Sequence, residues 1–183
     1  ANDSYGVGMY VSGTLIKDKL SLSLDGNFQG NDESDYVGGE GQKSGSSESE
    51  KKVRKFGTEL VWNVDEHHDI GLRYDFTGQQ YTTTLGKSVG IASQASTNEN
   101  EKELYTLTHK ASYDNFTVDS YYQDETTKKV YSGAVSDQKQ EDLKVFNTQG
   151  TFFLGDHTLT VGGQYQKEKI TDTTNGLASV TGV

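Results

Sequence analysis

The residues best suited to chemistry in this chain lie in one short polar stretch, where His67 and His68 stand beside Asp65, Glu66 and Asp69. Imidazole and carboxylate groups are common ligands of zinc in proteins. Adjacent residues on a turn rarely converge on one ion, however. The sequence therefore favours a solvated turn here, and we predict no metal site.

A second acidic group consists of Asp32, Glu33, Asp35 and Glu40. Carboxylate oxygens suit calcium, so a divalent cation site has to be considered. The spacing of the four residues matches no calcium-binding loop, and the segment VGGEG is too short for a glycine-rich calcium repeat. Solvated loop charge is the favoured interpretation.

Catalysis is not expected from the remaining polar residues. The four histidines are scattered along the sequence, and no set of nucleophile, base and orienting residue can be assembled around them. The serines and threonines fall mostly at polar strand or loop positions. We predict that the protein is not an enzyme and binds no cofactor directly.

Composition restricts the kind of protein further. Of 183 residues only 31% are hydrophobic, and the net charge is −10 with no cysteine. A soluble sandwich needs more apolar runs, whereas a disordered chain would have few aromatics, and here 10% are aromatic. No run approaches the roughly 18 apolar residues of a membrane helix, so a membrane interpretation requires strands. The acidic balance argues against nucleic acid as a partner.

The elements that carry these residues are predicted to be strands. Between positions 56 and 76, nearly all the apolar residues are even-numbered and most of the charged residues are odd-numbered. Successive strand residues point to opposite faces, so this stretch predicts a hairpin with one apolar and one charged face, in which Val64 lies opposite Ile70. The apolar set is Phe56, Leu60, Trp62, Val64, Ile70, Leu72, Tyr74 and Phe76, and the polar set is Glu59, Asn63, Arg73 and Asp75.

Three further hairpins follow the same pattern and are separated by long polar stretches. The predicted facing pairs are Leu15 with Leu20, Val11 with Leu24, Tyr113 with Phe116, and Phe152 with Leu159. The polar stretches cover about 29–53, 78–103, 124–141 and the chain from Asp172. Short turns alternating with long loops are typical of outer-membrane barrels. We therefore predict an all-β, antiparallel up-and-down transmembrane β-barrel of about eight strands, apolar toward lipid and polar toward a wet interior.

Four segments resemble successive barrel segments of TonB-dependent outer-membrane receptors. They are YVSGTLIKDKLSLSLDGNFQG, VWNVDEHHDIGLRYDF, EKELYTLTHKASYDNFTVDSYYQDE and LGDHTLTVGGQYQKEKITD. The likeness is to the ferric-enterobactin and colicin I receptor group and covers most of the chain in the right order. It implies that residues 1–183 are a single barrel segment of a larger barrel of about 22 strands, whose plug domain and remaining strands are absent from this chain.

The resemblance also implies a function. Receptors of this family reside in the bacterial outer membrane and import iron-siderophore complexes actively, energised through TonB, and some also serve colicins or phage. The iron travels within the siderophore ligand. The expected partners are a ferric siderophore, the TonB complex through parts outside this chain, and outer-membrane lipid. The siderophore is expected to be captured on the extracellular loops and the plug.

Candidate ligand-binding residues follow from the catecholate siderophores of this group. Aromatic faces and cations suit an anionic, ring-bearing ligand. Such residues are expected on the long loops at Tyr36, Tyr81, Lys87, Lys128 and Tyr131, with Lys129 nearby. Loop tyrosines also occur simply in membrane-interface girdles. The residues Trp62, Tyr74, Phe116 and Tyr122 are assigned to the wall and girdle.

Two other classes stay open on the sequence. A complete small eight-stranded barrel with a structural or adhesion role requires strand one to close on strand eight. A soluble lipocalin-like barrel requires an apolar lumen and a charged exterior, the reverse of the arrangement predicted above.

Overall fold

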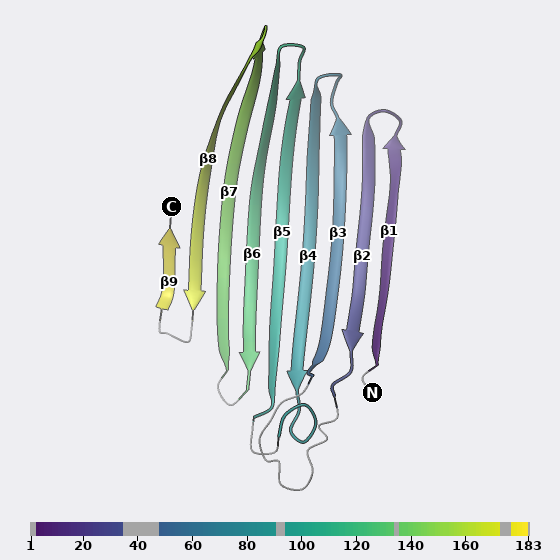
Figure 1. The fold of residues 1–183 in the computed structure, drawn as a ribbon, viewed down its shortest axis with the longest axis vertical. Coiled ribbons are helices and arrows are strands. Elements are labelled where there is room, and N and C mark those ends of the chain that lie inside the picture. Colours follow the sequence, from purple (N-terminus) through teal and green to yellow (C-terminus); the bar gives the residue numbers. More distant parts are fainter. Residues whose placement is uncertain (1–2, 35–47, 91–93, 134–135, 173–176, 183) are drawn as a thin grey trace.

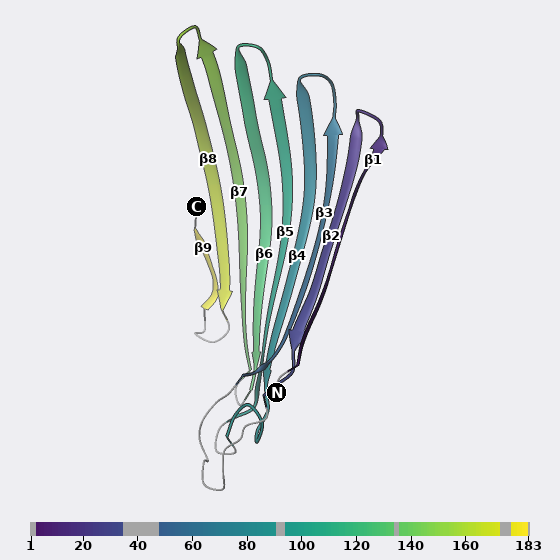
Figure 2. The same ribbon diagram turned by 45° about the vertical axis from the view of Figure 1, so that its right-hand side comes forward.

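The computed structural model describes residues 3–34, 48–90, 94–133 and 136–172, and the backbone of 177–182, which together form one antiparallel sheet of nine strands in sequence order. In two views the strands lie side by side in a single curved layer (Figures 1 and 2). Across the described residues, no helix is long and apolar enough to span a membrane. The strands are β1 (Ser4–Ile16), β2 (Leu20–Asn31), β3 (Glu50–Asn63), β4 (His68–Thr83), β5 (Ser96–Ser112), β6 (Phe116–Ser132), β7 (Asp137–Leu154), β8 (His157–Asp172) and β9 (Leu177–Gly182).

The two longest connections, 32–49 and 84–95, are both at one end of the sheet, whereas every other connection has at most four residues. At the end that we call the short-turn end, the strands are joined by residues 17–19, 64–67, 113–115 and 155–156. At the opposite, long-connection end lie residues 32–49, 84–95, 133–136 and 173–176 (Figure 1). The predicted all-β, up-and-down arrangement with short turns at one end is confirmed, and a short ninth strand is added to the eight expected.

The strands are longer than the sequence pattern indicated. Strand β4 runs to Thr83 and β6 to Ser132, so much of the predicted loops at 78–103 and 124–141 is regular strand. These parts carry polar side chains on both faces, and a hydrophobic alternation appears only where the two faces meet different media. The backbone ladder continues regardless of that alternation, so the predicted boundaries were wrong.

Most of the predicted strand pairing is confirmed. Val11 lies opposite Leu24 and Phe152 opposite Leu159, as expected. The Tyr113 N–H donates to the Phe116 carbonyl at 2.9 Å, which fixes the predicted third turn. Two predicted pairs were wrong. One is shifted by two residues, which keeps the side chains on the same face, and the other is displaced by a β-bulge. They are Ile70, which lies opposite Trp62 rather than Val64, and Leu20, which lies opposite Ile16 rather than Leu15.

Local turn chemistry explains the shift in the β3–β4 hairpin. The Asp65 carboxylate accepts hydrogen bonds from the backbone N–H groups of His67 at 2.8 Å and His68 at 2.9 Å. The Val64 N–H donates to the His68 carbonyl at 2.8 Å, which closes a turn over residues 65–67, two residues shorter than the predicted turn over 65–69. These bonds lower the pKa of Asp65, the His67 N–H having the largest effect, so the carboxylate stays charged and holds the turn.

The two faces of the sheet differ in exposure. The face that carries Phe56 and Leu107, called the outer face below, is apolar and open, with Val7 67% and Val161 58% exposed. On the opposite, inner face Val53 is only 2% and Val145 8% exposed. Side chains on the inside of a curved sheet converge and cover one another. The apolar side chains are therefore on the outside, as the barrel prediction requires, and not in a sealed interior.

The apolar zone of the outer face ends at an aromatic side chain on each of seven strands. We call these residues the aromatic row: Phe28, Phe56, Phe76, Tyr105, Tyr122, Phe146 and Tyr165, on β2 to β8. From Phe146 to Leu154 the outer face spans about nine residues, the usual length of a membrane-crossing strand. Two residues beyond the row the outer side chains include Arg54, Glu103 and Lys144. Such a girdle at a polarity boundary is typical of transmembrane barrels.

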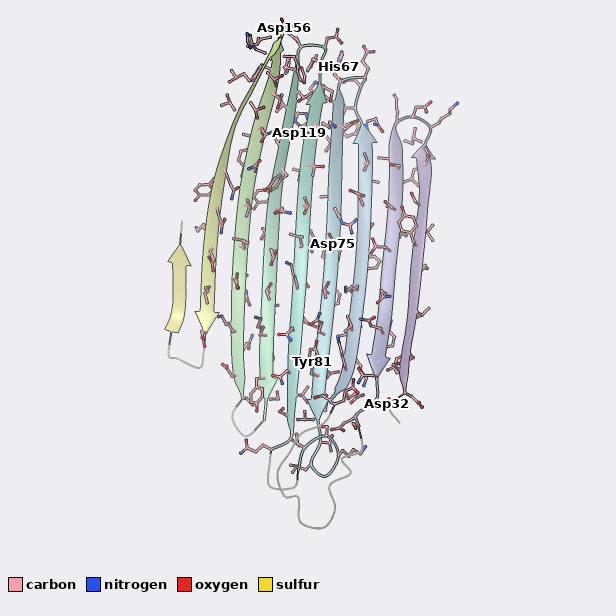
Figure 3. All side chains as sticks on the ribbon, in the orientation of Figure 1. Asp32, His67, Asp75, Tyr81, Asp119 and Asp156 are labelled. Atoms are coloured by element: carbon pink, nitrogen blue, oxygen red, sulfur yellow. The ribbon has the colours of Figure 1, made fainter. Side chains whose placement is uncertain are left out.

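The inner face carries a charged cluster at the level of the apolar zone. The Arg73 guanidinium lies 2.5 Å from Asp75, 3.5 Å from Asp25 and 3.9 Å from Glu59. Gly57 makes room for it, because a Cβ there would lie 2.4 Å from the Asp25 carboxylate. Figure 3 shows Asp75 midway between the two ends of the sheet. One guanidinium group thus lies among carboxylates from three neighbouring strands, β2, β3 and β4, and reduces the repulsion between them.

Replacing Arg73 by Gln should lower the free energy of unfolding by about 1–2 kcal/mol, because three carboxylates would then face one another in a partly shielded site. Denaturant unfolding of the protein in detergent measures the loss. Asp75→Asn on the Arg73→Gln background should recover part of it. The control Lys55→Gln removes an exposed inner cation that makes no ion pair within the described ranges, and should change stability by less than about 0.5 kcal/mol. An equal loss in both single variants contradicts the role of the cluster.

Candidate functional site

The five residues predicted to bind ligand do not all lie on loops. Lys87 lies on the 84–95 connection, and Tyr36 lies outside the described residues. The other three, Tyr81, Lys128 and Tyr131, are on strands β4 and β6, so their assignment to loops was wrong for the reason given above. Figure 3 shows Tyr81 near the long-connection end.

Strand register decides which of these side chains share a face. Tyr81 and Tyr131 both pair with Asn98 in one row across the sheet, and Lys51 pairs with Tyr81 in the same row. Their side chains therefore point to the inner face. Lys128 has the same parity as Tyr122 of the aromatic row and points outward. An inward-facing ligand would not meet Lys128.

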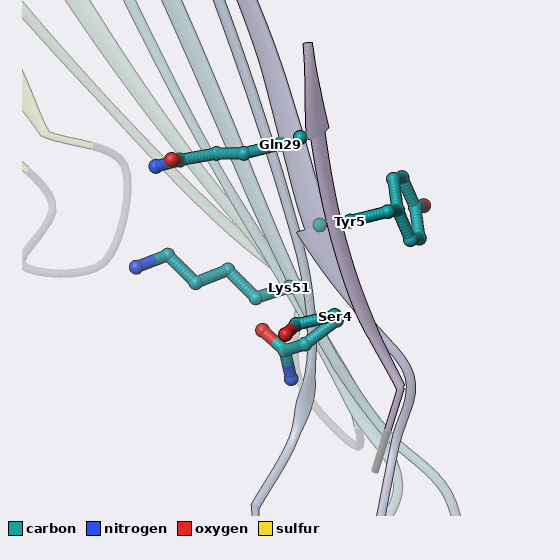
Figure 4. Close-up of a pocket in the computed structure, with 7 residues that line it drawn as sticks. Ser4, Tyr5, Gln29 and Lys51 are labelled. Carbon is teal, nitrogen blue, oxygen red and sulfur yellow. The ribbon is translucent and has the colours of Figure 1, made fainter.

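The inner face near β1 contains a polar hollow. It is lined by the side chains of Ser4, Gln29, Asn31 and Lys51 and by the backbone between them. Figure 4 shows Tyr5 pointing away from the other strands, while Gln29 and Lys51 point to the side on which β9 lies. The Lys51 ammonium also lies 5.7 Å from the centre of the Tyr81 ring, a cation–π distance.

Two more lysines complete this surface: Lys129, which the sequence analysis named only as a neighbour of the candidate residues, and Lys139, which it did not name. Lys129 on β6 lies directly opposite Lys139 on β7, both on the inner face. Within the described part of the chain neither forms an ion pair. Like charges facing each other across a ladder are destabilising, so the pair is suited to an anion between or above them. Strand parity, extended past Tyr122, is the signal that separates Lys129 from its neighbour Lys128.

These residues form one surface, which we call the inner rim: Lys51, Tyr81, Lys129, Tyr131 and Lys139. The Tyr131 ring lies over Gly133, where a Cβ would come within 2.7 Å of the hydroxyl group. The rim thus offers two aromatic rings and three ammonium groups from β3, β4, β6 and β7. Ring faces and cations together recognise anionic aromatic ligands by stacking and charge attraction.

A carboxylate ties two of the long connections together next to this rim. Glu33 follows β2, and its Oε1 accepts hydrogen bonds from the Thr84 N–H and the Ser88 hydroxyl, with the Ser88 N–H at 3.4 Å. Ser88 is fully buried. Partial desolvation acts to raise the pKa of Glu33, but the bonds from Ser88 and Thr84 together outweigh it and the pKa is lowered.

In the acidic group considered for calcium, Glu33 thus has another role, as the hydrogen-bond acceptor of the 84–90 segment. Glu33 is engaged by Thr84 and Ser88, and Asp35 and Glu40 lie outside the described residues. Within the ranges that the structure describes, no group of three potential metal ligands occurs.

Three of the four histidines, His67, His68 and His109, lie together in space, which the sequence prediction missed. His68 Nδ1 lies 3.0 Å from His109 Nε2, and His68 Nε2 lies 2.9 Å from the Tyr113 hydroxyl. His67 stacks on Tyr113 at 4.4 Å between ring centres. The turn is therefore packed against β5 and is not simply solvated. The adjacent strands β4 and β5 bring together residues that are far apart in sequence. Because the rings bond and stack with one another, the arrangement is structural.

The architecture described above defines a class of fold. A single antiparallel sheet in sequence order, with an apolar outer face and a polar inner face, is the fold of a segment of an up-and-down transmembrane barrel wall.

Comparison with solved structures gives the same fold. The sheet superposes on a mutant of the ferric enterobactin receptor PfeA from Pseudomonas aeruginosa with a TM-score of 0.72 and 15% identity, covering 92% of this chain and 29% of that one. The siderophore receptor PirA from Pseudomonas aeruginosa gives a TM-score of 0.69 and 15% identity, with 97% and 28% coverage. The chain spans less than a third of either receptor. No family model and no curated protein sequence matches.

Replacing Glu33 by Gln should loosen the 84–90 segment. The charged carboxylate has a lowered pKa, so its contribution is complete above the ordinary glutamate value of about 4.3 and is lost as the pH falls through the lowered pKa. Hydrogen exchange of the 84–90 amides, corrected for intrinsic rates, should rise up to about fivefold in Glu33→Gln at neutral pH. The unaltered chain should match it only in acid. Asp32→Asn is the matched control and should leave exchange unchanged; an equal rise there contradicts the assignment.

Proposed function

We propose that this chain is part of the barrel wall of an outer-membrane receptor for ferric siderophores. The observation that carries the proposal is the outer face, where an apolar zone of membrane-spanning length ends in an aromatic row while ions line the opposite face. A backbone group left unpaired in hydrocarbon costs several kcal/mol, so such strands function within a closed barrel. Within the described residues β1 pairs only with β2, and β9 only with β8. Further strands of the receptor would pair with these edges.

The ligand best suited to the inner rim is a ferric catecholate siderophore. Such a complex is anionic and presents aromatic rings on its outside. Tyr81 and Tyr131 supply ring faces, and Lys51, Lys129 and Lys139 supply positive charge on the same inner face. The two solved receptors named above, one for ferric enterobactin, have the same fold over this segment.

Transport would need parts that lie outside this chain. In the proposed receptor, energy reaches the ligand through TonB and a plug domain inside the barrel, and this segment supplies wall and part of the capture surface. The 32–49 and 84–95 connections, tied by Glu33, would also be accessible to a colicin or a phage from outside.

The alternatives fit the observations less well. A lipocalin-like barrel needs an apolar lumen, whereas the inner face at mid-height holds Arg73 with its three carboxylates. A complete small barrel needs β1 to pair with a strand at the other end of the chain, and in the described sheet these edges are not paired with each other.

Neutralising the inner lysines should weaken binding of a ferric tris-catecholate complex. We expect the purified receptor that contains Lys129→Gln and Lys139→Gln to bind at least about tenfold less tightly, because two cations facing the anion are lost. Equilibrium binding of the iron-labelled complex measures this. Lys128→Gln, next in sequence but facing outward, is the matched control and should bind normally. An equal loss of affinity in Lys128→Gln and in the variant with Lys129→Gln and Lys139→Gln would refute the inner rim as the binding surface.

Arginine scanning tests which face meets lipid. Leu107→Arg places a charge on the outer face within the apolar zone and should cost about 2–4 kcal/mol in vesicle-embedded receptor. Thr108→Arg places the same charge on the inner face of the same strand, opposite Gly71 and Tyr121, and should cost far less. Unfolding of both variants in lipid vesicles by denaturant gives the comparison. A larger loss for Thr108→Arg would reverse the two faces and favour a soluble barrel.

A further inference from the structure

A cationic patch lies on the outer face just beyond the aromatic row, at the long-connection end of β7 and β8. It consists of Lys144, Lys167 and Lys169. Lys167 follows Tyr165 of the row by two residues, about 7 Å along the strand, and Lys144 precedes Phe146 by the same spacing. Lys144 and Lys167 therefore lie at the level where lipid headgroups begin if the apolar zone is in the hydrocarbon, and Lys169, four residues beyond Tyr165 or about 13 Å along the strand, extends the patch further toward the long connections.

The placement of these lysines is unfavourable without a ligand. Lys144 and Lys167 lie directly opposite each other on β7 and β8. Facing like charges destabilise a sheet. Lys144 is neutralised on its other side by Asp124, whose Oδ2 lies 2.9 Å from the ammonium group. Among the residues that the structure describes, no carboxylate lies within ion-pair distance of Lys167 on its other side.

The carboxylate nearest to Lys169 in register is already engaged. Asp142 lies opposite Lys169, but its Oδ1 accepts hydrogen bonds from Thr126 at 3.1 Å and Gln140 at 2.8 Å. Neither Lys167 nor Lys169 forms an ion pair within the described part of the chain, and both are exposed. Other outer cations near the row differ in this respect, since Arg54 lies 3.9 Å from Glu101.

We propose that Lys144, Lys167 and Lys169 form a binding site for the phosphate of an anionic lipid headgroup in the leaflet at the long-connection end. The acyl chains of that lipid lie along the apolar outer face below Tyr165. A freely diffusing phosphate would lack this apolar contact, which is why the occupant is a lipid. Lys128 is outside the site, because it lies six residues beyond Tyr122, about 20 Å along the strand. The inference rests on the membrane orientation of the proposed function.

Native mass spectrometry of the detergent-purified receptor tests the site, with a bisphosphorylated lipid A as the probe. Lys167→Gln with Lys169→Gln should reduce retention of this lipid on the order of tenfold, since each lysine near a lipid surface contributes strongly to anion attraction. The control is Lys17→Gln with Lys19→Gln, which removes the same charge at the short-turn end and should leave retention unchanged. Lys167→Arg with Lys169→Arg keeps the charge and should retain the lipid.

Several outcomes would overturn the site. They are unchanged retention in Lys167→Gln with Lys169→Gln, equal losses in the two Gln pairs, equal retention of the dephosphorylated lipid, and displacement of the lipid by inorganic phosphate at the same phosphate concentration. The last result would assign the patch to a free anion. The proposed receptor function is tested separately by binding of the ferric catecholate complex to the unaltered receptor, so the two can fail independently.

Discussion

The constraint on which the rest of this structure depends is that each strand meets two different media over part of its length. Where hydrocarbon is on one side and water on the other, the side chains alternate, and Leu107 points outward while Thr106 points inward. Every backbone group there must be paired by a neighbouring strand. The sheet therefore grows by simple hairpins in sequence order, and its charged groups, such as Arg73, are collected on the wet side.

This constraint explains how far the sequence could be interpreted. The alternation identified all eight long strands and which face each side chain shares, and pairs such as Val11 with Leu24 and Phe152 with Leu159 followed from it. It could not predict where the strands end at the long-connection end, because water lies on both sides there and polar residues occupy both faces. Tyr81 and Tyr131 were selected for their chemistry but placed on loops for that reason.

The candidate site was accessible to prediction only in part. Residue type found two tyrosines of the inner rim and drew attention to Lys128 and Lys129 alike, whereas Lys139 and the choice of Lys129 needed the register between β6 and β7. Lys128 and Lys129 are chemically alike, and one step along a strand separates an inward from an outward charge. The contacts of Glu33 with Ser88 and of His68 with His109 join residues far apart in sequence. No spacing rule within one segment predicts such contacts.

The length of the strands beyond the aromatic row has a consequence for how such a receptor can change. Residues from Asp124 to Ser132 belong to a hydrogen-bonded ladder that stands clear of the apolar zone. In the proposed receptor, the groups that would meet a ligand there are held on hydrogen-bonded strands and not on loops. Selectivity in this part of the protein should then evolve by exchange of single inward side chains, and grafting a neighbouring receptor's loops would transfer little of it.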